Sequence, residues 1–86
     1  MKTIFKYQLA ITDEQTLFLP KDAEILSVAD QGGMLCMWAA IETCNLPESR
    51  VIKIYGTGHT LQPDERYIGT IMQAGGALVW HVFEKP

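Results

Sequence analysis

Residues 51–80 decide the fold, and they read VIKIYGTGHTLQPDERYIGTIMQAGGALVW. Two isoleucine-rich runs lie in or at the edge of this stretch, residues 50–55 and 67–72, and a polar loop at residues 57–66 separates them. A Gly-Gly turn then leads into a third apolar run. Short apolar runs bounded by glycine and polar turn residues are typical of β-strands. The stretch therefore predicts three strands, joined by one long loop and one tight turn.

The same pattern continues on both sides of this stretch. Further strands are predicted at residues 3–11, 15–19, 24–29 and 34–41, and the last at 77–84. The first two are predicted to form a hairpin, and a second hairpin is predicted around Gly32-Gly33, because a reversal at two glycines demands positive φ. We expect an all-β chain, a small antiparallel β-sandwich or barrel of about seven strands.

Length and cysteine content restrict what holds the chain together. Its 86 residues predict a single domain, residues 1–86. A domain of this size buries only about 60% of its unfolded surface, so it is marginal alone. Cys36 and Cys44 are expected to be free thiols, the commoner state in an intracellular chain, with one short-loop disulfide between them as the alternative. The chain has no CxxC motif or Cys/His cluster, which gives no support for a zinc site.

Self-association is the expected source of further stability. The chain is 48% hydrophobic, and residues 34–41 are apolar on both faces. Such a run is either a central strand covered on both sides or part of a subunit interface. Trp38 and Trp80 are expected in the core or in subunit packing. We therefore expect a homo-oligomer, a dimer or a tetramer.

The net charge of the chain limits the kinds of molecule that it is expected to bind. The net charge is −3 and the sequence pI is about 5.2, so the chain offers little of the basic face that binding to long nucleic acid requires. The apolar residues near the N-terminus are interrupted by Lys6, Tyr7 and Gln8, which fits neither a signal peptide nor a membrane span. We expect a cytoplasmic protein with no membrane partner.

The loop that begins at Gly56 resembles a GxGxxG dinucleotide-binding motif only at its start. Leu61 stands where the third glycine belongs, and no helix follows whose N-terminus would hold a pyrophosphate. Two glycines around Thr57 still allow the backbone to expose amide groups to an anion. The alternative is a loop that merely needs two residues with positive φ.

Aromatic and basic residues bracket this loop. Tyr55 precedes it, and Arg66 and Tyr67 end it. An arginine pairs with phosphate while a neighbouring ring stacks on a base; the alternative is a surface ion pair with Glu48 or Glu65. The predicted ligand-binding residues are Tyr55, Gly56, Thr57, Gly58, His59, Arg66 and Tyr67.

No catalytic set, metal site or cofactor is predicted. Asp64 and Glu65 are sequence neighbours and are expected to point apart, which gives little support for paired acid–base chemistry. His81 shares a strand face with Val79 and Phe83 and is expected to be a hydrogen-bonded core or interface residue.

Several blocks resemble a family of short, mostly phage-encoded proteins of uncharacterised-domain type. These blocks are IYGTGH at residues 54–59, YIGT at 67–70 and GGALVWHVFE at 75–84, together with the opening 6–28. In size and expected assembly, the chain also resembles the oligomeric sponges by which phages sequester nucleotide signals of bacterial immunity, such as anti-CBASS proteins.

These resemblances imply a phage-type protein that binds a small nucleotide-like second messenger, of the cyclic dinucleotide kind, in the host cytoplasm without turnover. Two alternatives stay open. One is a phage accessory module that docks on another protein through its apolar strands. The other is a nucleotide phosphodiesterase that uses His59.

Overall fold

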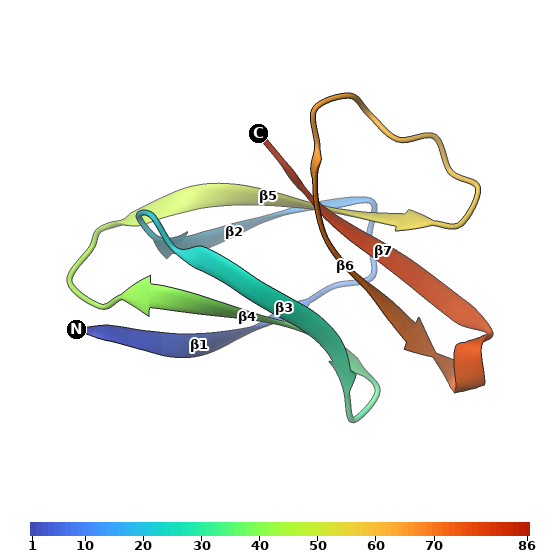
Figure 1. Ribbon diagram of the computed structural model, residues 1–86, viewed down its shortest axis with the longest axis horizontal. Helices are drawn as coiled ribbons and strands as arrows, with labels where there is room; N and C mark the ends of the chain where they lie inside the picture. The colour runs from blue at the N-terminus through green and yellow to red at the C-terminus, as the bar shows by residue number, and fades with distance from the viewer.

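The computed structural model describes all 86 residues. The chain forms seven antiparallel strands in two sheets (Figure 1). The strands are β1 (Lys2–Leu9), β2 (Glu14–Pro20), β3 (Glu24–Gln31), β4 (Met34–Glu42), β5 (Pro47–Gly56), β6 (Arg66–Gln73) and β7 (Leu78–Lys85). Sheet A has the order β1-β4-β3, and sheet B has the order β2-β5-β7-β6. The expectation of an all-β chain of about seven strands is confirmed.

The only helical segment is η1 (Ala74–Gly76), a single 3-10 turn between β6 and β7. No helix of the chain is therefore long and apolar enough to span a bilayer.

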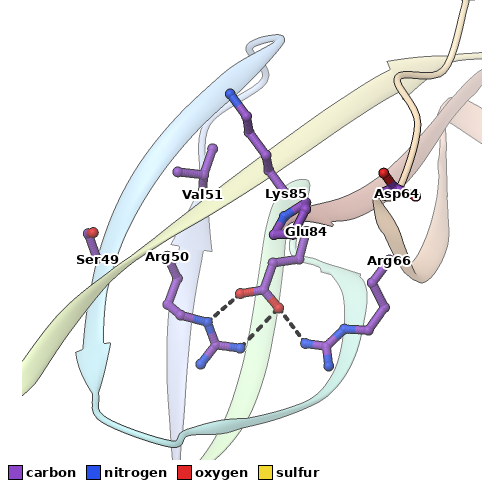
Figure 2. Close-up of a pocket in the computed structure, with 8 residues that line it drawn as sticks. Ser49, Arg50, Val51, Asp64, Arg66, Glu84 and Lys85 are labelled. Carbon is purple, nitrogen blue, oxygen red and sulfur yellow. Dashed lines mark hydrogen bonds and ion pairs between the residues drawn. The ribbon is translucent and has the colours of Figure 1, made fainter.

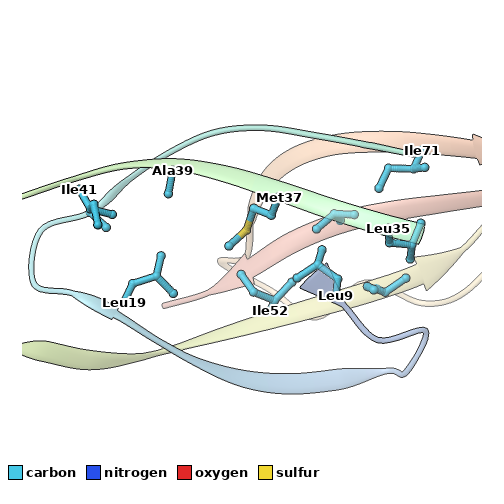
Figure 3. Close-up of a cluster of buried hydrophobic side chains, with 11 residues drawn as sticks. Leu9, Leu19, Leu35, Met37, Ala39, Ile41, Ile52 and Ile71 are labelled. Carbon is cyan, nitrogen blue, oxygen red and sulfur yellow. The ribbon is translucent and has the colours of Figure 1, made fainter. Parts of the chain in front are cut away.

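The hydrophobic core fills the space between the two sheets (Figure 3). Successive residues of a strand point to opposite faces of its sheet. On β4, Leu35, Met37, Ala39 and Ile41 are buried on the inner face, and Ile52 of β5 lies across from them. The central strands thus give alternate side chains to the core, whereas β1 has only Leu9 buried and β3 has no buried residue.

Close packing of β3 against β6 joins the sheets along one side. The pairing of β6 with β7 shifts by one residue between Tyr67 and Gly69. A Cβ atom on Gly69 would lie 2.8 Å from Cγ2 of Val28. Only glycine fits here without moving a neighbour.

Polar side chains tie the sheets together at both ends. Trp80 donates from Nε1 to Oε1 of Gln73 at 3.0 Å, and Nε2 of Gln73 donates to Oδ1 of Asp30 at 3.0 Å and to the Gly33 carbonyl at 3.1 Å. At the other end, Arg50 donates to the Ala23 carbonyl at 2.9 Å. Trp80 also packs against the core, as expected.

The predicted hairpin of the first two strands is wrong. β1 pairs with β4 in sheet A, whereas β2 pairs with β5 in sheet B. The connection is a corner between sheets, and the Gln15 side chain fixes it by accepting from the Ala10 N–H at 2.9 Å and donating to the Ala10 carbonyl at 2.8 Å. A side-chain amide thus makes the hydrogen bonds that a hairpin ladder would have made.

The two Gly-Gly hairpins are confirmed. β3 pairs with β4 around Gly32 and Gly33, and β6 pairs with β7 around Gly75 and Gly76; all four glycines have positive φ. β4 is the central strand of sheet A, as one of the two predictions had it, but only its inner face is covered by the second sheet, whereas the prediction had both faces covered. Both cysteines are free.

We predict that Gly69→Ala lowers the free energy of unfolding by about 1–3 kcal/mol, the usual cost of overpacking. Val28 is β-branched and its methyl group has little freedom to move away. Urea unfolding of Gly69→Ala, Val28→Ala and the double variant checks this. The double variant should be destabilised by less than the sum of the single changes; full additivity would contradict the proposed contact.

Candidate ligand groove

A groove lies on the outer face of sheet B beside the loop of residues 57–65. Its volume is about 230 Å³. Nine residues line it: Tyr55, Gly56, Thr57, Gly58, His59, Leu61, Tyr67, His81 and Phe83. The structure thus brings six of the seven predicted ligand-binding residues to one place.

Strand pairing explains why these residues meet. Tyr55 on β5 lies opposite His81 on β7, and Phe83 on β7 lies opposite Tyr67 on β6. Directly paired residues share a face of the sheet. The loop then returns from the end of β5 to the start of β6 and adds His59 and Leu61.

Three aromatic rings form the base of the groove. The Phe83 ring lies edge-on between its neighbours, with its centroid 5.6 Å from that of Tyr55 and 5.3 Å from that of Tyr67. Tyr55 is buried, whereas Tyr67 remains 57% exposed. Such edge-to-face packing fixes the rings and leaves the Tyr67 ring accessible to a planar ligand.

A chain of hydrogen bonds runs beside the aromatic rings. Nε2 of His81 lies 2.9 Å from Oγ1 of Thr57, and Nδ1 of His81 lies 3.2 Å from Oγ1 of Thr70. The Thr70 hydroxyl also lies 2.7 Å from the Tyr67 hydroxyl. Both ring nitrogens of His81 are thus satisfied by hydroxyl groups, but the residue lies in the outer-face groove and not in the core. The chain of hydrogen bonds fixes Thr57 at the start of the loop.

His59 is held in one tautomer by the backbone. Its Nδ1 accepts the Gly56 N–H at 3.1 Å, and its own N–H donates to the Gly56 carbonyl at 3.1 Å. Because an amide can only donate, Nδ1 carries no proton, and the neutral ring has its proton on Nε2. The N–H of Gly56, predicted to meet an anion, is therefore occupied by His59.

The two loop glycines serve different purposes. Gly58 has φ of +92°, a region that favours glycine. Gly56 does not have positive φ, but a Cβ atom there would lie 3.0 Å from Cε1 of His59. Gly56 thus leaves room for the imidazole ring to lie against the backbone.

Tyr55 anchors the far half of the loop. Its hydroxyl donates to the Glu65 carboxylate and accepts the Gln62 N–H at 3.4 Å. Burial, and next the hydrogen bond to Glu65, raise the pKa of Tyr55 above its ordinary value. The phenol therefore stays protonated at neutral pH and keeps the loop over the outer face of sheet B.

Arg66 is the predicted site residue that does not line the groove. It precedes Tyr67 on β6, so the two side chains point to opposite faces of sheet B. Arg66 instead ion-pairs with Glu84, which also accepts two hydrogen bonds from Arg50 (Figure 2). These three residues form the arginine–glutamate cluster, in a separate cavity of about 480 Å³.

The arginine–glutamate cluster is a preorganised ionic site. The side chains of Arg50 and Glu84 are 14% and 9% exposed, whereas that of Arg66 is 66% exposed. Burial opposes ionisation of Glu84, but hydrogen bonds and charge from Arg50, and then from Arg66, hold its pKa below the ordinary value of a glutamate. Neither arginine pairs with Glu48 or Glu65; both pair with Glu84.

Sequence reasoning missed Leu61, His81 and Phe83 as groove residues. The alternation of Val79, His81 and Phe83 indicated that they share a face. It did not indicate that this face is the one that carries Tyr55, because that depends on β7 inserting between β5 and β6.

The fold and the groove define a small two-sheet β-protein with an aromatic, histidine-containing surface groove. No three His, Cys, Asp or Glu side chains gather where they could hold a metal ion. The model of a family described as a domain of unknown function, DUF7352, matches residues 1–86, and the chain belongs to this family. No curated protein and no solved structure matches the chain.

We predict that Glu84→Gln lowers the free energy of unfolding by about 2 kcal/mol at pH 7, because it removes charge-assisted hydrogen bonds and leaves Arg50 unpaired. The folded-state pKa of Glu84 is lowered. Ionised Glu84 therefore stabilises the fold fully above its unfolded-state pKa of about 4.3, and this stabilisation is lost as the pH falls through its folded-state pKa. The difference in the free energy of unfolding between wild type and Glu84→Gln should therefore become smaller below about pH 4.

Urea unfolding at pH 7 and pH 3 measures this gap. Asp64→Asn is the matched control, since Asp64 lines the same cavity and makes no ion pair. An equal gap for Glu84→Gln at both pH values would contradict the assigned ionic role.

Proposed function

We propose that this protein binds a small nucleotide-like ligand without turning it over, and that the groove on the outer face of sheet B takes the base. The observation that carries the proposal is the accessible Tyr67 ring, held by Phe83 beside two histidines. A base stacks on an aromatic side chain and gains about 1–3 kcal/mol.

The size of the groove restricts the ligand. Pockets for drug-sized ligands occupy about 300–1,000 Å³, and this groove occupies about 230 Å³. It suits one base rather than a whole cyclic dinucleotide. If the ligand is the cyclic dinucleotide-like signal that the resemblance to phage sponges implies, a single groove would hold one of its two bases.

Polar groups around the rings supply hydrogen bonds for the edge of the base. Nε2 of His59 is a donor in its neutral tautomer, and the Thr57 hydroxyl and the N–H of Gly58 lie on the same loop. Such groups fix the orientation of a ligand whose ring is already stacked.

The state of His59 favours binding over catalysis. A phosphodiesterase that used His59 as a general base would need an unprotonated nitrogen aimed at the substrate. Nδ1 is unprotonated but accepts the Gly56 N–H, and Nε2 carries the proton. Product formation from a nucleotide that is abolished by His59→Ala would revive the enzyme alternative.

Calorimetric titration with adenosine, adenosine monophosphate and cyclic di-adenosine monophosphate tests the proposal. We predict that Tyr67→Ala and His59→Ala each weaken binding of the tightest of these ligands about tenfold, because each removes about 1.4 kcal/mol of contact. Both side chains are exposed, so the fold should survive the substitutions. Met72→Ala is the matched control, since Met72 is 63% exposed on the same strand and lies outside the groove.

Arg66→Ala tests where the phosphate lies. Arg66 belongs to the predicted site but is on the inner face, so we expect unchanged affinity for adenosine. A loss of affinity for the monophosphate alone would place the phosphate at the arginine–glutamate cluster. Binding of none of the three ligands, or binding that Tyr67→Ala leaves unchanged, would contradict the proposal.

A further inference from the structure

A second hollow adjoins the ligand groove at Thr57, which lines both. The volume of this second hollow is about 290 Å³, and that of the groove is about 230 Å³. The hollow lies where β7 extends beyond β5, because β5 ends at Gly56, opposite Trp80, whereas β7 already begins at Leu78. The rest of its lining is apolar and comes from Ala77, Leu78, Val79 and Trp80.

The backbone of Val79 offers unpaired polar groups in the second hollow. The Ile54 N–H donates to the Asp13 carbonyl on the β2 side, so the backbone groups of the next residue, Tyr55, point to β7. His81, which lies opposite Tyr55, points its own groups to β5, and so does Val79, which has the same parity on β7. β5 has already ended there, and no loop residue makes a backbone hydrogen bond to Val79. One backbone donor and one acceptor are therefore open to a ligand.

The turn where the groove and the second hollow meet carries two free amide groups. The His59 N–H donates to the Gly56 carbonyl at 3.1 Å and closes a β-turn. The N–H groups of its two central residues, Thr57 and Gly58, have no acceptor in the chain. The Thr57 hydroxyl, 2.9 Å from Nε2 of His81, belongs to the same turn. Backbone N–H groups and hydroxyls of this kind bind phosphate oxygens.

We propose that the groove and the second hollow together bind a dinucleotide, with one base in each and the linking phosphate at the turn of Thr57 and Gly58. This dinucleotide site rests on the proposed function, because the groove supplies the place for the first base.

The chemistry of the second hollow fits the second base. Its apolar lining covers the face of a planar ring, and the free N–H and carbonyl of Val79 hydrogen-bond the edge of the base. The edge of an adenine presents a donor and an acceptor side by side. An apolar lining with few placed polar groups is typical of small-molecule sites. Each chain therefore holds both bases, and no second subunit is needed.

Calorimetric titration with adenosine monophosphate and with the dinucleotide adenylyl-adenosine tests this site. We expect one dinucleotide per chain, bound about tenfold more tightly than the monophosphate, because the second base is already tethered when the first has bound. Leu78→Ser should remove this advantage and leave the affinity for the monophosphate unchanged. Leu46→Ser is the matched control, since Leu46 is 81% exposed just before β5 and lines neither the groove nor the second hollow.

Ala77→Trp is an independent test, because it fills the second hollow from an exposed position. It should also remove the advantage of the dinucleotide, and it keeps the test valid if Leu78→Ser fails to fold. Equal affinity of the wild type for the two ligands would overturn the dinucleotide site. A stoichiometry of one dinucleotide per two chains would do the same, and so would a dinucleotide affinity that neither variant lowers.

Tyr67→Ala separates this failure from failure of the proposed function. It should weaken binding of both ligands, because both place a base in the groove. If it weakened binding of the monophosphate while the dinucleotide gained nothing, the single-base groove would stand and the dinucleotide site would not. If it weakened binding of neither ligand, the proposed function would fail and the dinucleotide site with it.

Discussion

The insertion of β7 between β5 and β6 is the constraint on which the structure depends. Its alternate residues divide between two tasks. Trp80, Val82 and Glu84 point inward, where they close the core and hold the two arginines. His81 and Phe83 point outward, where they meet Thr57, Thr70 and the two tyrosines of the groove. A shift of one residue in β7 would exchange these sets and destroy both.

The two faces of sheet B therefore carry different sites: the arginine–glutamate cluster lies on the inner face and the groove lies on the outer face. The arginine–glutamate cluster is ionic and preorganised, and it ties the start of β6 to β5 through Glu84. The groove is aromatic and carries neutral hydrogen-bonding groups. Arg66 and Tyr67 are neighbours in sequence, yet they belong to different sites because a strand turns successive side chains to opposite faces.

Much of the fold follows from local sequence. The glycine pairs at 32–33 and 75–76 predict both hairpins correctly, since only residues tolerant of positive φ make these reversals. The pairing of β1 with β4 does not follow from local sequence, because the two strands are distant along the chain. At the corner between the sheets, the Gln15 amide hydrogen-bonds to Ala10.

Part of the candidate groove could be predicted from the sequence. The loop glycines and the flanking tyrosines identified Tyr55, Thr57, His59 and Tyr67, because all lie near one loop. His81 and Phe83 join them only through strand register, which a single sequence does not specify. Glu84 was missed as the partner of both arginines for the same reason, since it reaches them across the sheet.

The most direct test of the account is an NMR titration of the nitrogen-15-labelled protein with adenosine monophosphate. The account predicts that amide shifts concentrate at residues 55–61, Tyr67, His81 and Phe83, on the outer face of sheet B. Shifts confined to Arg50, Arg66 and Glu84 would place the ligand at the ionic cluster instead. Either that result or the absence of any shift at millimolar ligand would contradict the claim that the outer-face groove is the binding site.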